Sequence, residues 1–212
     1  MKKILVFASG SKTGGGSGFG ELVEHTKTGL LPADIVAVVS SHPEGGVFQI
    51  AQEYGVPFEY FPGPYEAEGY QKLVAKYSPD LIALSGWLKL AKGLDPTKTI
   101  NIHPGPLPLF GGQGMYGHFV HESVIDSYKK GLIMESAVTM HFVTDEYDKG
   151  PVIFRYPVLI REDDTAETLA ARVNEKERAW QWYITKLVLT GEISWDGQNP
   201  KSLLVPQGYP FL

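Results

Sequence analysis

The chain has 212 residues, of which 43% are hydrophobic and 20% are charged. This composition is too apolar for a disordered chain, and no apolar run reaches the ~20 residues that a membrane-spanning helix needs. A formal net charge of -5 argues against nucleic acid or an acidic membrane as partners, so we expect small-molecule partners. The sequence contains no cysteine, which excludes disulfides and zinc-thiolate sites. With no secretory-signal pattern after Met1, we expect a cytoplasmic protein.

The first half of the sequence alternates apolar runs with helical patterns. Residues 3–8 (KILVFA) are continuously apolar, which predicts a strand buried on both faces, and the glycine-rich residues 9–20 lead into a helix. Strands that alternate with helices predict an α/β fold with a doubly wound, mostly parallel sheet. The further elements predicted in this half are strands at 34–41, 57–61 and 81–86 and helices near 44–54 and 65–77.

The second half of the sequence changes character. A strand is predicted at residues 99–103, and the prolines and glycines of residues 104–117 predict a long irregular loop. A helix near residues 118–130 then leads to strands at 137–143 and 152–160, which we expect to run antiparallel. Because no linker or repeat divides the sequence, we expect a single domain.

The glycine-rich loop of residues 9–20 is a candidate phosphate site. It follows the first strand, and α/β sheets bind ligands at the carboxyl ends of their strands. Backbone N–H groups and a helix N-terminus in such a loop can hold a phosphate. The loop matches neither the P-loop nor the dinucleotide-binding pattern, which disfavours an ATPase or a dehydrogenase. The alternative is a flexible turn with no ligand.

Asn101-Ile102-His103 ends the strand at residues 99–103. Residues i and i+2 of a strand point to the same face, so the Asn101 amide and the His103 imidazole are expected side by side. Such a pair can stabilise the oxyanion of a tetrahedral intermediate and move a proton. The alternative is a strand end whose polar residues simply leave the core.

Asp148 lies in the acidic turn after residues 137–143. A carboxylate close to His103 would favour the imidazolium and raise the pKa of His103. The alternative is an acidic turn on the surface, because the sequence alone cannot show that the two residues are close.

A long C-terminal helix is predicted from Thr165, with Asp163 or Asp164 near its N-cap. Glu177 interrupts the apolar stripe of this helix, and a charge in such a stripe needs a partner or a ligand. The alternative places Glu177 at the edge of the stripe, where its carboxylate reaches water. The apolar members of the stripe are Leu169, Val173, Trp180 and Ile184.

His118, His121 and Glu122 (in HFVHE) could suggest metal ligands. No H-E-x-x-H motif is present, so we interpret these residues as a solvated helix face and expect no metal.

Three segments occur together in one order: LSGWLKLA (residues 84–91), NIHPGPLP (101–108) and HFVTDEYDKGP (141–151). Together with the glycine-serine loop, they make nearly the whole chain resemble the phosphoribosylglycinamide formyltransferase family. The resemblance implies a Rossmann-like formyltransferase fold, with a phosphate-binding N-terminal half and a folate-binding, catalytic C-terminal half. It also implies formyl transfer from 10-formyltetrahydrofolate to the amine of 5'-phosphoribosylglycinamide in de novo purine biosynthesis, without a metal, by a monomer or homodimer.

The resemblance assigns roles residue by residue. It implies that Asn101, His103 and Asp148 are catalytic, with His103 held protonated by Asp148. The implied acceptor-binding residues are Gly16, Ser17 and Gly18 for the phosphate and Asn174 and Glu177 for the ribosyl group. The implied folate-binding residues are Leu88, Lys89, Leu90, Ala91, Asn101, Thr144, Asp145, Glu146, Tyr147 and Asp148.

The sequence departs from the family's pattern at several positions. The loop has extra residues around 11–13, Gly18 stands where Asn is common, and Lys89 stands where Arg is common. The helix near residues 66–76 is shorter, and we find no basic residue that matches one used by some members near the folate. The alternatives are a formyltetrahydrofolate hydrolase, a sugar-amine or methionyl-tRNA formyltransferase, or a noncatalytic nucleotide-binding module.

Overall fold

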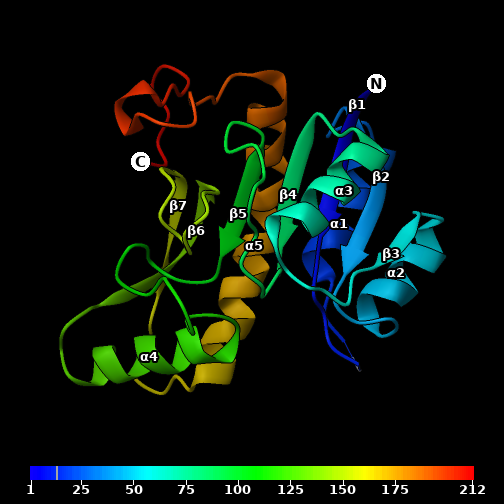
Figure 1. Ribbon diagram of the computed structural model, residues 1–212. Helices are drawn as coiled ribbons and strands as arrows, with labels where there is room; N and C mark the ends of the chain where they lie inside the picture. The colour runs from blue at the N-terminus through cyan, green and yellow to red at the C-terminus, as the bar shows by residue number, and fades with distance from the viewer. Residues whose placement is uncertain (13) are drawn as a thin grey trace.

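In the computed structural model, which describes residues 1–12 and 14–212, seven strands form one sheet in the order β3-β2-β1-β4-β5-β6-β7 (Figure 1). Strands β1 to β5 are parallel, whereas β6 runs antiparallel to both β5 and β7. The mostly parallel α/β sheet predicted from the sequence is therefore confirmed, as is its antiparallel end. The strands are β1 (Lys2–Phe7), β2 (Ala33–Ser40), β3 (Phe58–Tyr60), β4 (Leu81–Ser85), β5 (Thr99–His103), β6 (Glu135–Phe142) and β7 (Val152–Leu159).

Helices cover both faces of the sheet because its central strands are apolar on both sides. On β1, Ile4 and Val6 join the core cluster that contains residues of α1 and α5, whereas Leu5 and Phe7 join the cluster that contains α3. Alternate residues of a strand point to opposite faces, which explains why this run is continuously apolar. The helices are α1 (Ser17–Lys27), α2 (Gly46–Tyr54), α3 (Ala67–Tyr77), α4 (His118–Lys129), α5 (Ala166–Thr190) and the short 3-10 helix η1 (Pro200–Ser202).

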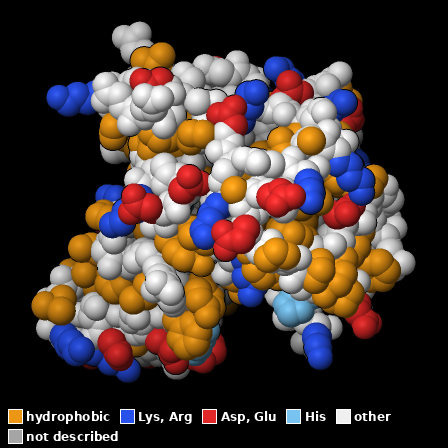
Figure 2. Space-filling model, viewed as in Figure 1, with side chains coloured by type: hydrophobic (Ala, Val, Ile, Leu, Met, Phe, Trp, Pro, Cys, Tyr) orange, Lys and Arg blue, Asp and Glu red, His pale blue; other side chains and the backbone are white. Residues whose placement is uncertain are grey.

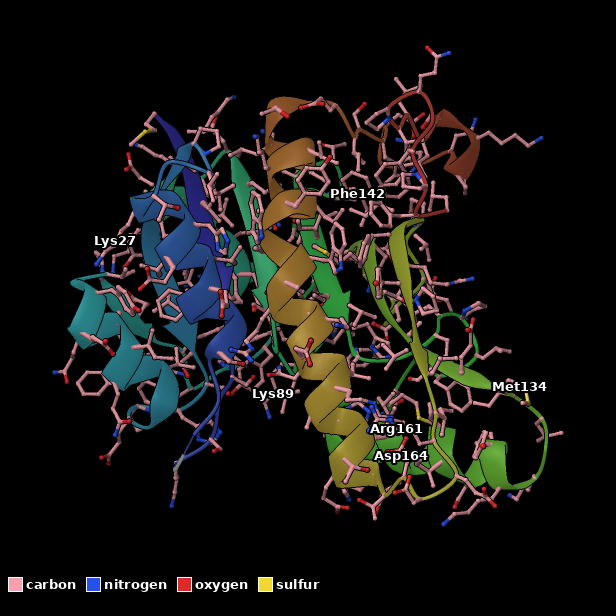
Figure 3. All side chains as sticks on the ribbon, turned by 180° about the vertical axis from the view of Figure 1, so that it is seen from behind. Lys27, Lys89, Met134, Phe142, Arg161 and Asp164 are labelled. Carbon is pink, nitrogen blue, oxygen red and sulfur yellow. The ribbon has the colours of Figure 1, made fainter. Side chains whose placement is uncertain are left out.

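The N-terminus of α5 agrees with the prediction. Its N-cap is Thr165, whose side chain accepts a hydrogen bond from the Thr168 N–H, while Thr168 Oγ1 accepts one from the Thr165 N–H. Asp164 instead pairs with Arg172. Figure 3 shows Asp164 at this end of the helix. Asp164 therefore lies next to the N-cap, and Thr165 and Thr168 open the helix, as the sequence predicts.

The chain beyond α5 was not predicted. It crosses back to the far edge of the sheet, where the Phe211 carbonyl accepts a hydrogen bond from the Arg155 N–H at 2.9 Å. The Tyr209 hydroxyl donates to the Ile153 carbonyl at 2.7 Å. This segment therefore satisfies part of the open edge of β7, which protects it from pairing with another chain. Among the helices that the structure describes, none is long and apolar enough to cross a membrane.

Candidate active site

A cavity of about 470 Å³ lies where β1, β4 and β5 end. Figure 2 shows the molecule hollowed at its lower edge, between α4 and the loop that follows β1. The position agrees with the rule that α/β sheets bind ligands at the carboxyl ends of their strands. Residues from α4 and α5 complete the wall, so distant parts of the sequence meet here.

The structure brings together the three residues expected to be catalytic. Asn101, His103 and Asp148 all line this cavity. The Asp148 carboxylate lies 3.8 Å from His103 Nδ1, a distance longer than a direct hydrogen bond. His103 Nε2 donates a hydrogen bond to the Phe110 carbonyl at 2.7 Å. The Phe110 carbonyl therefore holds the ring, and the carboxylate faces its other nitrogen.

The electrostatics of His103 correct one prediction. Its side chain is buried, and this burial lowers the pKa of His103, although the Asp148 carboxylate and the Phe110 carbonyl both act to raise it. The expectation that Asp148 holds His103 protonated was therefore wrong, because loss of solvent outweighs a carboxylate that stands 3.8 Å away. At neutral pH the ring is neutral, with its proton on Nε2.

Asp148 is held in place by its backbone and by its neighbours. Its φ of 55° lies in the left-handed region, which Asp adopts more readily than most residues. Burial acts to raise the pKa of Asp148, but the His141 and His103 imidazoles and the Gly112 N–H together bring it below its ordinary value. The Gly112 N–H donates to the carboxylate at 2.9 Å. Asp148 is thus a fixed carboxylate on the cavity wall.

His141 is a further member of this group, which the sequence alone did not indicate. His141 Nδ1 lies 2.7 Å from the Phe142 carbonyl oxygen, and Nε2 lies 3.1 Å from the Asn101 amide nitrogen. The same Nε2 lies 3.3 Å from Asp148 Oδ1. His141 therefore connects two of the three predicted catalytic residues. Its place follows from the antiparallel pairing of Asn101 with His141, a register that the sequence does not show.

The two expected folate segments face each other. A second cavity, of about 40 Å³, is lined by members of both segments and also by Asn101 and Asp148. Leu88 lines the larger cavity instead, while Asp145 accepts a hydrogen bond from the Gly93 N–H at 2.8 Å and so ties the segments together. Lys89 Nζ lies 5.2 Å from the centre of the Tyr65 ring, a cation–π distance. The predicted folate residues that line the second cavity are Lys89, Leu90, Ala91, Asn101, Thr144, Glu146, Tyr147 and Asp148.

The expected phosphate loop stands at the N-terminus of α1. Gly16 is the N-cap with a φ of 89°, and Ser17 and Gly18 begin the helix, so their N–H groups have no partner within it. The first turn, Ser17–Gly20, contains no acidic residue. All three predicted residues line the larger cavity. Thr13, in the extended part of this loop, lies outside the described residues.

Gly18 has a structural reason to be glycine. A Cβ atom there would lie 2.4 Å from Ser85 Oγ and 2.6 Å from Gln181 Oε1. Those two atoms share a buried hydrogen bond of 3.1 Å, which joins the end of β4 to α5. Glycine at position 18, where Asn is common in the family, therefore leaves room for the hydrogen bond between Ser85 of β4 and Gln181 of α5.

Asn174 and Glu177 lie beside the loop, on the cavity side of α5. The Asn174 amide donates to Ser17 Oγ at 3.4 Å and to Glu177 Oε2 at 3.3 Å. Glu177 is half-buried, and its withdrawal from bulk water raises its pKa to about 7. Both residues line the larger cavity with Ser17, so the structure brings the predicted acceptor-binding set together.

The interpretation of residues 118–122 as a solvated helix face is wrong for His121. His118 is partly exposed and lies 3.1 Å from Glu122, as a surface residue would. His121 is only 5% exposed and lines the cavity. Within residues 1–12 and 14–212, no group of three or more His, Cys, Asp or Glu side chains could hold a metal ion.

Residues 2–187 match the formyl transferase family, a range that covers all seven strands and most of α5. The chain therefore belongs to the formyl transferase family.

Within that family, the chain is similar to phosphoribosylglycinamide formyltransferases. The chloroplastic enzyme of Arabidopsis thaliana is 34% identical over 92% of this chain and 68% of its own length. The Bacillus subtilis enzyme is 31% identical over 89% of this chain and 95% of its own length. The structure of glycinamide ribonucleotide transformylase 1 from Symbiobacterium toebii has a TM-score of 0.81 and 25% identity, covering 97% of this chain and 94% of that one. The resemblance seen in the sequence is thus confirmed. A formyltetrahydrofolate deformylase also matches, at lower identity than the first two.

Proposed function

We propose that this enzyme transfers the formyl group of 10-formyltetrahydrofolate to the amine of 5'-phosphoribosylglycinamide, in de novo purine biosynthesis. The observation that carries the proposal is the junction of the two cavities. Asn101 and Asp148 line both of them, so a group that passes from one ligand to the other would do so beside these side chains. The larger cavity suits the nucleotide, and the smaller one is the proposed pterin site.

The smaller cavity must widen to admit a pterin. Its volume of about 40 Å³ is far below that of a bicyclic ring. We propose that residues 144–147 move away from the segment 88–91 when the folate binds, while Asp148 keeps its place beside His103, because the hydrogen bond from Gly93 to Asp145 is exposed and can exchange with water. The backbone groups released by this movement then become available to the pterin.

Asn101 is proposed to stabilise the oxyanion. An amide NH₂ group has two N–H donors, and one of them is directed at His141 Nε2. The second is available to the formyl oxygen as the amine attacks the formyl carbon and negative charge develops there. A donor that is already fixed before the reaction lowers the barrier because it need not reorganise in the transition state.

His103 is proposed to move the proton. With Nε2–H bonded to the Phe110 carbonyl, Nδ1 of the neutral ring has a free lone pair on its Asp148 side. Nδ1 accepts the proton that the amine loses after attack, and the resulting imidazolium is stabilised by the Asp148 carboxylate. The ring then returns this proton to the departing folate nitrogen. The lowered pKa of His103 makes the ring a base at the start and a good acid at the end.

The proposal is tested by measuring folate product formation with and without phosphoribosylglycinamide. Turnover that requires the acceptor supports the transferase. Turnover without the acceptor would instead indicate a formyltetrahydrofolate hydrolase, the second candidate, which shares the same three residues. Asp148→Asn serves as the inactive control, because Asn also tolerates a positive φ and leaves the backbone intact.

The remaining expectations concern cofactors and partners. We propose that both substrates are small molecules, that no metal takes part, and that the protein acts in the cytoplasm as a single-domain monomer or homodimer. Turnover that is unchanged by a chelator would support metal-free chemistry, and light scattering of the purified protein would give its oligomeric state.

A further inference from the structure

His121, on the inner face of α4, has no role in the chemistry described above. Its side chain is 5% exposed, and Nδ1 is enclosed without a hydrogen-bond partner among the residues that the structure describes. Its neighbours Val120 and Val124 on the same helix are fully buried and apolar. A buried polar atom without a partner destabilises the folded protein, and an apolar residue here would avoid that cost. The fold itself therefore gives no reason for a histidine at this position.

The ring has a defined chemical state. Burial, followed by the neighbouring His118 and His103 rings, lowers the pKa of His121 to about 4, so the imidazole is neutral at physiological pH. A neutral ring carries one proton. Because an enclosed N–H without a partner costs more than an enclosed lone pair, the proton is favoured on Nε2, and Nδ1 is left as the unpaired acceptor. Nε2–H is then the donor that can reach the cavity.

His121 lines the larger cavity at the end away from the phosphate loop. The loop follows β1, whereas α4 follows β5, and β4 lies between those two strands. Strands are spaced about 4.8 Å apart, so the ends of β1 and β5 are separated by about 10 Å. His103, which is proposed to take the proton of the attacking amine, ends β5 and is close enough to His121 to affect its pKa.

We propose that His121 is a binding residue for the acceptor, donating a hydrogen bond from Nε2–H to an uncharged oxygen of its sugar or amide portion. This inference rests on the proposed function. A neutral donor at the amine end of the cavity fixes the acceptor at the end opposite its phosphate. The amine is then held beside the formyl group, while the folate lies across the junction at Asn101 and Asp148 and does not contact His121.

The test compares His121→Leu with His121→Gln in steady-state kinetics with phosphoribosylglycinamide and 10-formyltetrahydrofolate. Leu has a similar volume and no donor, whereas the Gln amide places a donor near the position of Nε2. We expect His121→Leu to raise the acceptor KM roughly threefold to tenfold, the effect of one lost neutral hydrogen bond, with an unchanged folate KM. His121→Gln should stay within about twofold of the wild type. His121→Leu should also melt at or above the wild-type temperature, because it removes the unpaired Nδ1.

Val124→Ala is the matched control, because Val124 is fully buried on the same helix and lies outside the cavity lining. It should lower the melting temperature and leave both KM values unchanged. An acceptor KM unaffected by His121→Leu would overturn the inference, and so would equal increases for both substrates. Wild-type turnover is measured first. If acceptor-dependent turnover is absent, the proposed function fails, whereas a normal wild type with silent His121 variants contradicts the role of His121 alone.

Discussion

The two ends of the larger cavity differ in the groups that line them: backbone N–H groups at one end and functional side chains at the other. At the β1 end, Gly16, Ser17 and Gly18 begin α1 with free backbone N–H groups, and a Cβ atom added at Gly16 or Gly18 would collide with neighbouring side chains. At the β5 end, the proposed chemistry lies in the side chains of Asn101, His103 and Asp148, which other side chains and backbone groups hold in place. The first end should therefore be sensitive to added atoms, and the second to changed functional groups.

The largest expected effect is at the β5 end. His103→Ala and Asp148→Asn should each lower kcat by at least ~100-fold, the scale of lost acid-base or oxyanion assistance. Melting temperatures should stay near that of the wild type. The two losses should be less than additive in the double variant, because both residues act on one proton. Full activity in either single variant would contradict the mechanism.

The pH dependence of the β5 end sharpens this prediction. In the proposed mechanism the neutral form of His103 is the active one, so kcat/KM should fall in acid, with a midpoint below the ordinary histidine value because burial lowers the pKa of His103. The Asp148 carboxylate acts to raise that pKa. In Asp148→Asn, the midpoint at which the residual kcat/KM falls in acid should therefore lie at a still lower pH. A shift to higher pH would show that His103 does not act as the base.

The second effect is at the β1 end. Gly16 has a φ of 89°, and a Cβ there would lie 3.0 Å from Val47 Cγ2, so Gly16→Val should weaken acceptor binding far more than folate binding. Calorimetric titration of each ligand measures this difference. Gly29→Val is the matched control, because Gly29 also has a positive φ, of 76°, but is in open space outside the cavity lining. Equal losses for both ligands would mean that the loop is a general structural turn.

Glu177 lies beside the loop at the β1 end, and the substitution Glu177→Gln should weaken acceptor binding but increase stability at high pH. Glu177→Gln should raise the acceptor KM roughly tenfold, as for a weakened hydrogen bond to a charged group, with little change in kcat. The carboxyl has a pKa of about 7 in the folded state and 4.5 as its ordinary value, so the folded protein holds this proton more tightly. The stabilisation of the folded protein by this tighter proton binding is fully present below pH 4.5 and is lost as the pH rises through 7.

The neutral amide of Glu177→Gln avoids that loss. The variant should therefore melt above the wild type at pH 8 and equal to it near pH 4, a comparison that calorimetric melts at both values provide. Lower thermal stability at pH 8 with an unchanged acceptor KM would assign Glu177 a purely structural role.

Features of the fold and site that depend on local sequence could be predicted, whereas features that depend on tertiary contacts could not. The strands, most helices and the pairing of Asn101 with His103 follow from local patterns: apolar runs, the i and i+2 spacing of these two residues, and glycines after a strand. The predicted role of Asp148 came from the family resemblance, because its local pattern fits a surface turn equally well. Features that depend on tertiary contacts could not be predicted in this way. His141 joins the site through an antiparallel register, and His121 is buried because α4 packs against α5. The charge state of His103 was predicted wrongly because burial cannot be read from neighbours in sequence.

The smallest expected effect is at Gly18, a residue of the β1 end that contacts the side chains of Ser85 and Gln181. In Gly18→Ala, the new methyl group can be accommodated only if Ser85 Oγ and Gln181 Oε1 both move, Ser85 by a change of rotamer and Gln181 by bending of its longer side chain. The cost should therefore be the lost hydrogen bond between them, about 1 kcal/mol of unfolding free energy, with a modest rise in acceptor KM. Chemical denaturation of four proteins measures it: wild type, Gly18→Ala, Gln181→Ala and the double variant. Because Gln181→Ala already removes that hydrogen bond and opens space, adding Gly18→Ala should cost almost nothing further. Additive losses would show that the methyl group clashes with the backbone, so that Gly18 would belong entirely to the end of the cavity that added atoms disrupt.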